Sequence, residues 1–405
     1  MKIDLRQAIY ALSDMLDLVG VEEVHHGKRV GFMAWVCGEA LGYTGTDLEF
    51  LFHAALLHDC GVSSTRTHKC LVDELLWDGA EEHCLIGAHR LQEFPAFCPM
   101  GPIIRFHHTS WTALQAESLT PRDAHFANLI FLLDRVDSMI SAHLGKDLLF
   151  AKDEIRSRLK DFSGQLFAPE LVEIFLDVSS SEAFWISLEQ PHLQDFLFGK
   201  EKSLSPILVT LVELKQLARI FADIVDAKSR YTAEHSLGVA RLARHLAEQA
   251  GLDDDHCIMV EIAGLLHDLG KLRIPDEILE TTGSLDPQSR STMLRHSFET
   301  YQILRRIDGM EEIAQWAAYH HERLDGNGYP FHCKDADLPC EARIIAVSDV
   351  FQALAQDRPY RPGKMPEQIV PMLRDLARTR RLDNNIVELA ALRPDHCWEI
   401  ATTAH

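Results

Sequence analysis

The sequence has no hydrophobic run long enough to cross a membrane, which takes roughly 18 consecutive apolar residues. Near the start of the chain, Asp4, Asp14 and Asp17 interrupt every apolar stretch, so the uninterrupted core of a secretory signal is missing. The nine cysteines are scattered and include no Cys-x-x-Cys pair, which disfavours a disulfide framework and a zinc ribbon. We therefore expect a cytoplasmic protein without a membrane span.

Basic residues are also in short supply. The chain has 40 Lys and Arg against 61 Asp and Glu, which gives a formal net charge of −21. Proteins that bind nucleic-acid polymers or anionic membrane surfaces neutralise phosphates with Lys and Arg. The charge balance therefore argues against both of these partners.

Histidine is abundant instead, with 22 residues among 405, against 7 Tyr and 6 Trp. Histidine is the commonest metal ligand in proteins. The composition, 46% hydrophobic and 25% charged, is that of a globular chain, and the length suits two or three domains. An acidic chain this rich in histidine indicates metal binding.

Two parts of the chain repeat the same spacing of residues. The pairs His58–Asp59 and His267–Asp268 each follow an apolar run, and a histidine stands 32 residues before each pair. A second interval, 24 residues from a histidine to a His-His pair, starts once at His83 and once at His296. Matching intervals of this kind indicate two copies of one structural unit.

Around these anchors, apolar residues recur every three or four positions, as in amphipathic helices. Strand-like alternation and hairpin dipeptides are scarce. We predict an all-α protein of two tandem helical bundles, residues 1–200 and 205–405. The boundary is expected in a loop at 199–206.

The second copy contains seven side chains that suit a metal site, each beside apolar residues on predicted helices: His235, His267, Asp268, His296, His320, His321 and Asp349. A lone buried histidine is more often a core residue, but seven buried imidazoles and carboxylates are costly without a shared cation. Asp268 and the histidine before it point about 100° apart on a helix, which suits a carboxylate bridging two metals. Nitrogen and oxygen donors favour iron, manganese, zinc or nickel.

The order H…HD…H…HH…D resembles the HD superfamily of metal-dependent phosphohydrolases. The second copy adds Lys271 in HDLGK, HHERLDGNGYP at 320–330 and DRPYR at 357–361. Over about 206–390, these segments together resemble the HD-GYP phosphodiesterases, which hydrolyse bacterial cyclic dinucleotides. The resemblance implies two HD-type bundles and an enzyme that opens cyclic di-GMP or 3′3′-cyclic GMP-AMP to the linear 5′-phosphorylated dinucleotide.

The resemblance also implies roles for individual residues. The seven donors would hold two divalent ions, with iron or manganese favoured and zinc or nickel as alternatives, and Asp268 would bridge them. Lys271 would neutralise charge on the scissile phosphate. The implied substrate-binding residues are Gly328, Tyr329, Arg358 and Arg361. Structural roles, salt bridges for the two arginines and loop support for the tyrosine, are the alternatives.

One position departs from the family. Many members place a glutamate four residues before the first histidine, where it helps to hold a third metal. Here that position is Tyr231, and Glu234 is adjacent to His235 and so faces elsewhere on a helix. This difference favours a binuclear centre.

The first copy resembles an HD domain that is degenerate as a dinucleotide enzyme. It keeps a candidate second metal set: His26, His58, Asp59, His83, His107, His108 and Asp134. The lysine position is Val62, and no GYP segment follows His108. Three interpretations stay open: a metal-bearing regulatory domain, a relic that serves packing or homodimer formation, and a second hydrolase of different specificity.

Two other functions compete with a cyclic dinucleotide phosphodiesterase. One is a catalytically idle module that senses the dinucleotide and signals through protein contacts. A sensor has no need of Lys271, which argues against it. The other is a nucleotide phosphohydrolase of the wider HD superfamily, which the GYP and DRPYR segments disfavour.

Overall fold

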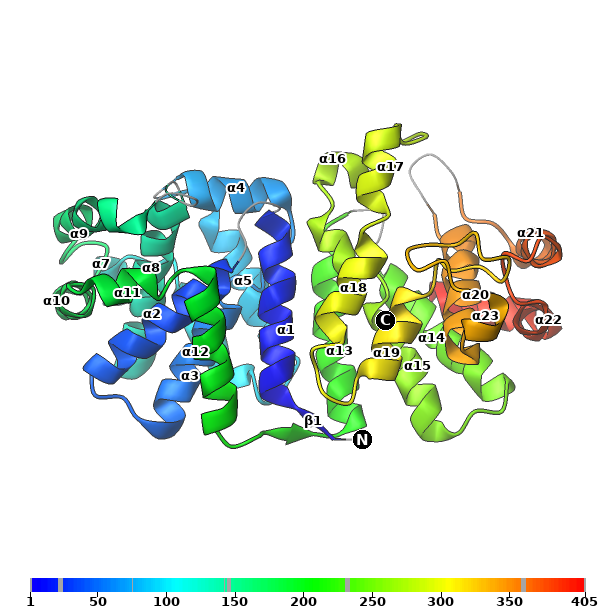
Figure 1. The fold of residues 1–405 in the computed structure, drawn as a ribbon, viewed down its shortest axis with the longest axis horizontal. Helices are drawn as coiled ribbons and strands as arrows, with labels where there is room; N and C mark the ends of the chain where they lie inside the picture. Colours follow the sequence, from blue (N-terminus) through cyan, green and yellow to red (C-terminus); the bar gives the residue numbers. More distant parts are fainter. Residues whose placement is uncertain are drawn as a thin grey trace. The chain divides into compact units, whose positions relative to one another are not determined.

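The structure, a computed structural model, describes residues 2–20, 25–74, 76–141, 143, 147–229, 234–357 and 362–403. Its regular elements are helices and one pair of two-residue strands (Figure 1). The predicted all-α class is therefore confirmed. No helix among the described residues combines the length and the hydropathy that crossing a membrane requires.

The contacts divide the chain into two compact units. The N-terminal unit is Leu12–Pro206, and the C-terminal unit is Ile207–His405 together with Met1–Ala11. The start of the chain joins the C-terminal unit because β1 (Ile3–Asp4) pairs antiparallel with β2 (Leu208–Val209). A two-residue strand has no periodic signal, so the predicted range 1–200 did not anticipate this pairing.

The division falls within α1 (Leu5–Asp17). The N-terminal unit continues with η1 (Leu18–Gly20), α2 (His26–Ala40), α3 (Gly45–Leu57), α4 (Thr65–Asp73), α5 (Ala80–Gln92), η2 (Cys98–Met100), α6 (Gly101–Phe106), α7 (Trp111–Leu114), α8 (Pro121–Ser141), η3 (Leu148–Phe150), α9 (Lys152–Asp161), α10 (Pro169–Val178), α11 (Glu182–Ile186) and α12 (Gln190–Ser203). The loop predicted at 199–206 is wrong for residues 199–203, because α12 continues to Ser203. Lys200 and Lys202 in its last turn favour the helical end through the helix dipole.

The C-terminal unit contains α13 (Leu211–Asp226), α14 (His235–Gln249), α15 (Asp254–Leu266), η4 (Leu269–Arg273), α16 (Asp276–Leu279), α17 (Pro287–Met293), α18 (His296–Leu304), α19 (Glu311–Ala318), η5 (Asp335–Asp337), α20 (Cys340–Ala355), α21 (Pro366–Arg378), α22 (Asn384–Leu392) and α23 (Pro394–Thr402). The central pair is α14 and α15, which pack along their lengths as α2 and α3 do in the other unit. Apolar side chains on these four helices form much of the two cores.

The same turn ends α2 and α14. Each helix is followed closely by a glycine, Gly42 or Gly251, and both have φ of +84°. This left-handed conformation costs little for glycine and allows the chain to reverse into the next helix. The turn brings α3 back along α2, and α15 back along α14. The histidine that begins α2 or α14 therefore lies near the His-Asp pair that follows α3 or α15.

A carboxylate holds the start of each of these helices. Asp17 accepts a hydrogen bond from the amide of Gly27 at 3.1 Å, and Asp226 accepts one from the amide of Ser236 at 3.0 Å. Both amides belong to the first helical turn, where backbone donors lack partners within the helix. The matching contacts fix the first histidine of each unit in the same way.

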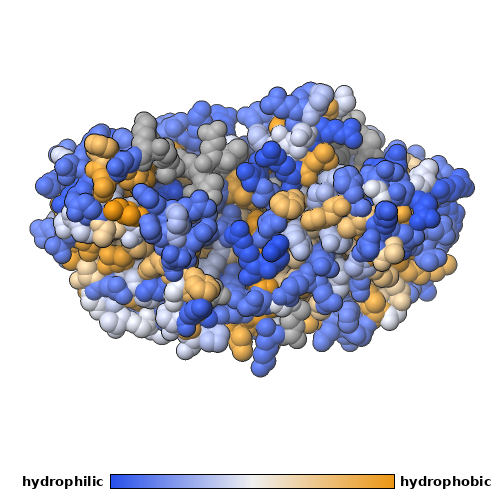
Figure 2. Space-filling view, viewed as in Figure 1, coloured by the Kyte–Doolittle hydropathy of each residue, from blue (hydrophilic) through white to orange (hydrophobic). Residues whose placement is uncertain are grey.

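On the face shown in Figure 2, hydrophilic residues predominate and apolar residues occur in separate patches.

Candidate metal centre and active site

Most of the predicted donors of the C-terminal unit lie at helix ends. His235 and His296 begin α14 and α18, His267 and Asp268 follow α15, and His320 and His321 follow α19. Asp349 lies within α20. His267 and Asp268 were expected within a regular helix. Instead, α15 ends just before them, and the chain continues into η4.

Asp268 connects two groups of histidines. One group is His235 and His267, whose Nε2 atoms lie 3.6 and 3.2 Å from Oδ2 of Asp268. The other includes His296 and His320, whose Nε2 atoms lie 3.6 and 3.8 Å from Oδ1. The two oxygens of one buried carboxylate thus face different sets of nitrogen donors, as a carboxylate between two cations does.

The remaining donors complete these groups. Oδ1 of Asp349 lies 3.3 Å from Nε2 of His235 and 4.0 Å from Nε2 of His267. Ligand atoms of His296, His320 and His321 lie within 4.8 Å of one another. All seven side chains that the sequence singled out are therefore brought together.

Three of the imidazoles are oriented by backbone carbonyls. Nδ1 of His267 donates to the carbonyl of Gly264 at 2.7 Å, and Nδ1 of His296 donates to that of Met293 at 2.6 Å. His320 is held in the same way, at 2.6 Å. Because Nδ1 carries the proton, the Nε2 lone pairs face the cluster, which is the arrangement of metal-ligating histidines.

The protonation states also suit a metal. Burial lowers the pKa of His296 to about 4 and that of His321 to about 3, so both are neutral at neutral pH. Burial alone would raise the pKa of Asp268, but the neighbouring His267 and Lys271 outweigh it and hold this pKa well below its ordinary value. Asp268 in turn raises the pKa of His267, so a cation bound here would displace a proton from that imidazole. Neutral imidazoles and an ionised carboxylate are the forms that bind a cation.

Two buried atoms in this cluster have no hydrogen-bond partner: Nε2 of His267 and Oδ1 of Asp268. A buried polar atom without a partner is costly, and a cation between the donors would satisfy both. The residues present therefore fit a divalent metal site, made of nitrogen and oxygen donors.

Lys271 lies at the edge of the cluster. Its ammonium group forms an ion pair with Oδ2 of Asp268, and 21% of its side chain is exposed, against 3% for that aspartate. The 3-10 helix η4 positions it one turn after the His-Asp pair. The ammonium is thus both next to the donors and accessible from solvent.

The loop that contains Gly328 and Tyr329 packs against the cluster. The Tyr329 ring lies 4.7 Å from that of His321, and burial raises the pKa of its hydroxyl. A Cβ atom on Gly328 would lie 2.4 Å from the Cα of Glu322, so this close approach requires glycine. The structure thus gives Gly328 a packing role, and its predicted contact with substrate stays a prediction.

Several predicted positions lie outside the described residues. These are Arg358 and Arg361, the two candidate contacts to phosphate or guanine, and Tyr231. Glu234 is described; it is exposed and precedes α14 with φ of +63°.

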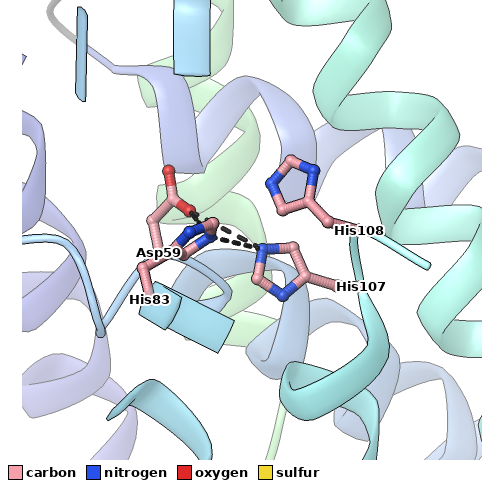
Figure 3. Close-up of side chains that lie close together, drawn as sticks. All are labelled: Asp59, His83, His107 and His108. Atoms are coloured by element: carbon pink, nitrogen blue, oxygen red, sulfur yellow. Dashed lines mark hydrogen bonds and ion pairs between the residues drawn. The ribbon is translucent and has the colours of Figure 1, made fainter. Parts of the chain in front are cut away.

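The seven matching residues of the N-terminal unit also come together. Oδ1 of Asp59 lies 3.4 Å from Nε2 of His83 and 3.7 Å from Nε2 of His107 (Figure 3). Oδ2 of the same carboxylate lies 3.6 Å from Nε2 of both His26 and His58. The two carboxylate oxygens of Asp59 thus face two different groups of histidines, as those of Asp268 do.

Asp134 and His108 complete this second cluster. Oδ2 of Asp134 lies 3.5 Å from Nε2 of His108, and Oδ1 lies 3.6 Å from Nε2 of His26. Figure 3 shows His108 beside His107, with the two rings 4.5 Å apart. The predicted candidate set of the first copy is therefore assembled in space.

Two residues that support these donors, and one that holds the following loop, were not predicted from the sequence. Gln352 accepts a hydrogen bond from Nδ1 of His235 at 2.5 Å, and Asp137 does so for His26 at 2.7 Å. Gln352 stands three residues after Asp349, and Asp137 stands three residues after Asp134, so the repeated spacing could have indicated both. Glu322, in the HHE segment, binds three backbone amides of the following loop.

Comparisons with known proteins agree with this arrangement. Residues 24–139 and residues 215–386 each match a family described as an HD domain. The predicted HD-type bundles are therefore confirmed.

Relatives with known roles match along much or all of the chain. 3′3′-cGAMP-specific phosphodiesterase 1 of Vibrio cholerae is 34% identical over 98% of this chain and 94% of its own length. A cyclic di-GMP phosphodiesterase of Thermotoga maritima is 31% identical over 48% of this chain and 48% of its own length. A crystal structure of cyclic GMP-AMP-specific phosphodiesterases in V. cholerae has a TM-score of 0.67, with 22% identity over 98% of both chains, and shares the fold.

The full-length identity, the two HD domains and the assembled His/Asp clusters lead to one conclusion: this chain belongs to the HD-GYP-type family of cyclic dinucleotide phosphodiesterases.

Proposed function

We propose that this protein is a metal-dependent phosphodiesterase that hydrolyses 3′3′-cyclic GMP-AMP to the linear 5′-phosphorylated dinucleotide, with its active site in the C-terminal unit. The observation that carries the proposal is the position of Asp268 between two groups of histidines, with Lys271 partly exposed beside it. Two cations and an ammonium group in this arrangement suit an in-line attack on a phosphodiester.

Two divalent ions held by the seven donors, iron or manganese ahead of zinc or nickel, would supply an activated water and positive charge for the phosphate. Asp268 shares its oxygens between the two groups of donors and so fixes their spacing. Lys271 can exchange its contact with Asp268 for a phosphate oxygen and neutralise the charge that develops there. The ring of Tyr329 packs 4.7 Å from that of His321 and would cover that side of the site.

The substrate is assigned from the relatives. The relative named for 3′3′-cGAMP aligns with almost the whole chain, whereas the cyclic di-GMP phosphodiesterase of T. maritima aligns with less than half of it. Cyclic di-GMP is the second candidate, because that alignment and the GYP segment support it. The acidic net charge is no obstacle, since bound cations determine the local charge.

The test is incubation of the purified chain, loaded with Fe²⁺ or Mn²⁺, with 3′3′-cyclic GMP-AMP, cyclic di-GMP and cyclic di-AMP. We expect the hybrid dinucleotide to be cleaved fastest, with a 5′-phosphorylated linear product. Faster cleavage of cyclic di-GMP would reassign the substrate. Binding of a dinucleotide without turnover of any would favour the sensor function instead.

A double substitution links the activity to the site. His267→Ala with Asp268→Ala should remove metal from the C-terminal unit and abolish turnover together, because the bridge and one nitrogen donor are lost. The matched control is His245→Ala, a partly exposed histidine of α14 that lies against His396. Hydrolysis retained in the double variant would contradict the proposed site.

A further inference from the structure

A cavity of about 560 Å³ lies in the C-terminal unit, next to the first histidine of the metal cluster. Helices α14, α20 and α23, which pack together, provide most of its walls (Figure 1). Glu234, directly before His235, lines the cavity, and so does Gln352, which accepts the hydrogen bond from that histidine. None of the seven donors, all of which are described, lines it. The cavity is therefore separate from the metal site, and its volume is in the range of small-molecule pockets.

One wall of the cavity is fixed by backbone contacts. The amide of Lys364 donates to the carbonyl of Leu354 at 2.9 Å, which holds the chain against the end of α20. A Cβ atom on Gly363 would lie 2.1 Å from the carbonyl oxygen of Ala355, so this approach requires glycine. Nε1 of Trp398 donates to the carbonyl of Lys364 at 3.0 Å. The indole and the wall are thus held in place before any ligand binds.

The cavity has an aromatic surface. Trp398 is half-buried and lines it, together with Met365, whose side chain is 53% exposed. Because Nε1 of Trp398 is already bonded to the backbone, the ring offers a ligand mainly its apolar surface. A tryptophan held in this way suits a planar ring, and nucleobases stack on such side chains.

The polar groups of the cavity are two carboxylates and an amide. Glu234 and Asp357 are exposed, and no Lys or Arg is present among the described lining residues. Gln352 is 2% exposed, and its oxygen is taken by His235. Its amide nitrogen has no hydrogen-bond acceptor within the described part of the chain, so this buried donor is left for a ligand.

These groups match guanine better than the other parts of a cyclic dinucleotide. The Watson–Crick edge of guanine has one acceptor, O6, beside the donors N1–H and N2–H₂, whereas adenine has a single amino donor there. The amide nitrogen of Gln352 suits O6, and a carboxylate suits the two donors. One oxygen of Asp357 already accepts from the amide of Gly363 at 2.7 Å, so Glu234 is the better candidate. A phosphate would meet two carboxylates and is disfavoured.

The position of the cavity suits a base whose phosphate is at the metal cluster. Glu234 is one residue from a metal donor, and Asp357 is the first residue of the DRPYR segment. A base is one sugar away from its phosphate. The cavity and the cluster are therefore arranged as two parts of one nucleotide are.

We propose that this cavity binds the guanine base of the dinucleotide, stacked on Trp398 and hydrogen-bonded to Gln352 and Glu234. The inference rests on the proposed function for the identity of the substrate. The cavity itself is tested with nucleosides, which have no phosphate and are not hydrolysed.

The first test titrates guanosine and adenosine into the full-length chain and follows binding by saturation-transfer NMR. We expect guanosine to bind about tenfold more tightly than adenosine, because it offers two donors to the carboxylate. Trp398→Leu should weaken guanosine about 10- to 100-fold, whereas Trp398→Phe keeps an aromatic ring and most of the affinity. Trp111→Leu, in the N-terminal unit, is the control and should bind as the wild type does.

A surface substitution tests the carboxylate without disturbing the core. Glu234→Gln should lower the affinity for guanosine about tenfold and reduce the preference over adenosine, since the amide provides one acceptor instead of two. The matched control is Glu277→Gln, an exposed glutamate of α16. No binding of guanosine to the wild type, tighter binding of adenosine, or equal guanosine affinity in Trp398→Leu and the wild type would each overturn the proposal.

The second test uses the dinucleotide. Trp398→Leu should mainly raise KM for 3′3′-cyclic GMP-AMP, about 10- to 100-fold, and leave the metal content unchanged, because the indole contacts a base and no metal donor. A lower kcat with unchanged KM would contradict a role in base binding. If guanosine binds but no dinucleotide is cleaved, the proposed function fails alone; if cleavage occurs without guanosine binding, only the base site fails.

Discussion

A hydrogen bond between His235 and Gln352 determines which nitrogen of the His235 imidazole carries the proton. Nδ1 of His235 lies 2.5 Å from the amide oxygen Oε1 of Gln352, and because that oxygen only accepts, Nδ1 must carry the proton. Nε2 is then free to bind a cation. Gly238 makes room for the contact, since a Cβ atom there would lie 2.9 Å from Cγ of Gln352.

Replacing Gln352 should therefore weaken metal binding. We expect Gln352→Leu to lower the affinity of the C-terminal centre about 10–100-fold, because His235 loses the partner that orients it. Gln352→Glu restores an oxygen acceptor and should keep most of the affinity. Competition with a chelator measures both, and equal affinities for the Leu variant and the wild type would show that the contact does not position the ligand.

Replacing Lys271 should reduce turnover and leave metal content unchanged. We expect Lys271→Met to lower kcat about 100- to 1,000-fold, because the ammonium group acts on charge that develops in the transition state. The control is Arg273→Met, on the same 3-10 helix, whose guanidinium pairs with Glu299 at 2.5 Å. Loss of metal together with turnover would instead assign Lys271 a structural role at Asp268.

Glu322 should hold the loop that follows Tyr329. Its carboxylate accepts hydrogen bonds from the amides of Phe331, His332 and Cys333, at 2.6, 3.1 and 3.0 Å. Glu322→Ala leaves these amides without their partner, at about 1–3 kcal/mol for each that stays buried, so we expect a lower melting temperature and a higher KM. Glu322→Gln keeps one acceptor oxygen and should be intermediate. An unchanged KM in the Ala variant would exclude a role in substrate binding.

Gly270 should tolerate no side chain. A Cβ atom there would lie 2.0 Å from the carbonyl oxygen of His296, and the matching Gly61 would meet the carbonyl of His83 at 1.9 Å. Gly270→Ala must move α18 away from the His-Asp pair, so we expect a loss of about 1–3 kcal/mol or more in unfolding free energy, with weaker metal binding. Gly283→Ala, where a Cβ atom meets nothing within 4 Å, is the control in the same unit. Equal stability of the two variants would contradict this packing.

His256 should make a pH-dependent contribution to stability. Its hydrogen bond to Asp253, at 2.9 Å, raises its pKa above the ordinary value of 6.5. A raised pKa means that the stabilisation is complete below pH 6.5 and is lost as the pH rises through the folded-state pKa. We therefore expect His256→Ala to lower the melting temperature more at pH 5.5 than at pH 8.5. His192→Ala, an exposed histidine of α12, serves as control, and an equal effect at both pH values would contradict the expected linkage.

The sequence alone determined the helical fold, the duplication and which side chains are candidate metal donors. These depend on local properties: the three-to-four periodicity of apolar residues predicts helices, and equal intervals between His58–Asp59 and His267–Asp268 and their neighbours place matching chemistry in each copy. Histidine and aspartate also offer donor atoms by their own chemistry, and their repeated grouping marks them as candidate donors. For these reasons all fourteen predicted donors could be named in advance, and the structure brings them together in two clusters.

Only the tertiary structure decided how the donors are held and how the two clusters differ. Gln352 supports His235 from 117 positions away, and Asp137 supports His26 from 111 positions away. Contacts over such distances depend on how helices pack, and no periodicity within one segment reports them. The same holds for the pairing of β1 with β2 and for the burial of Arg29 and Arg135. The sequence identified the candidate donors because their chemistry is local, whereas packing determined that Arg29 and Arg135 are buried and that Lys271 is partly exposed.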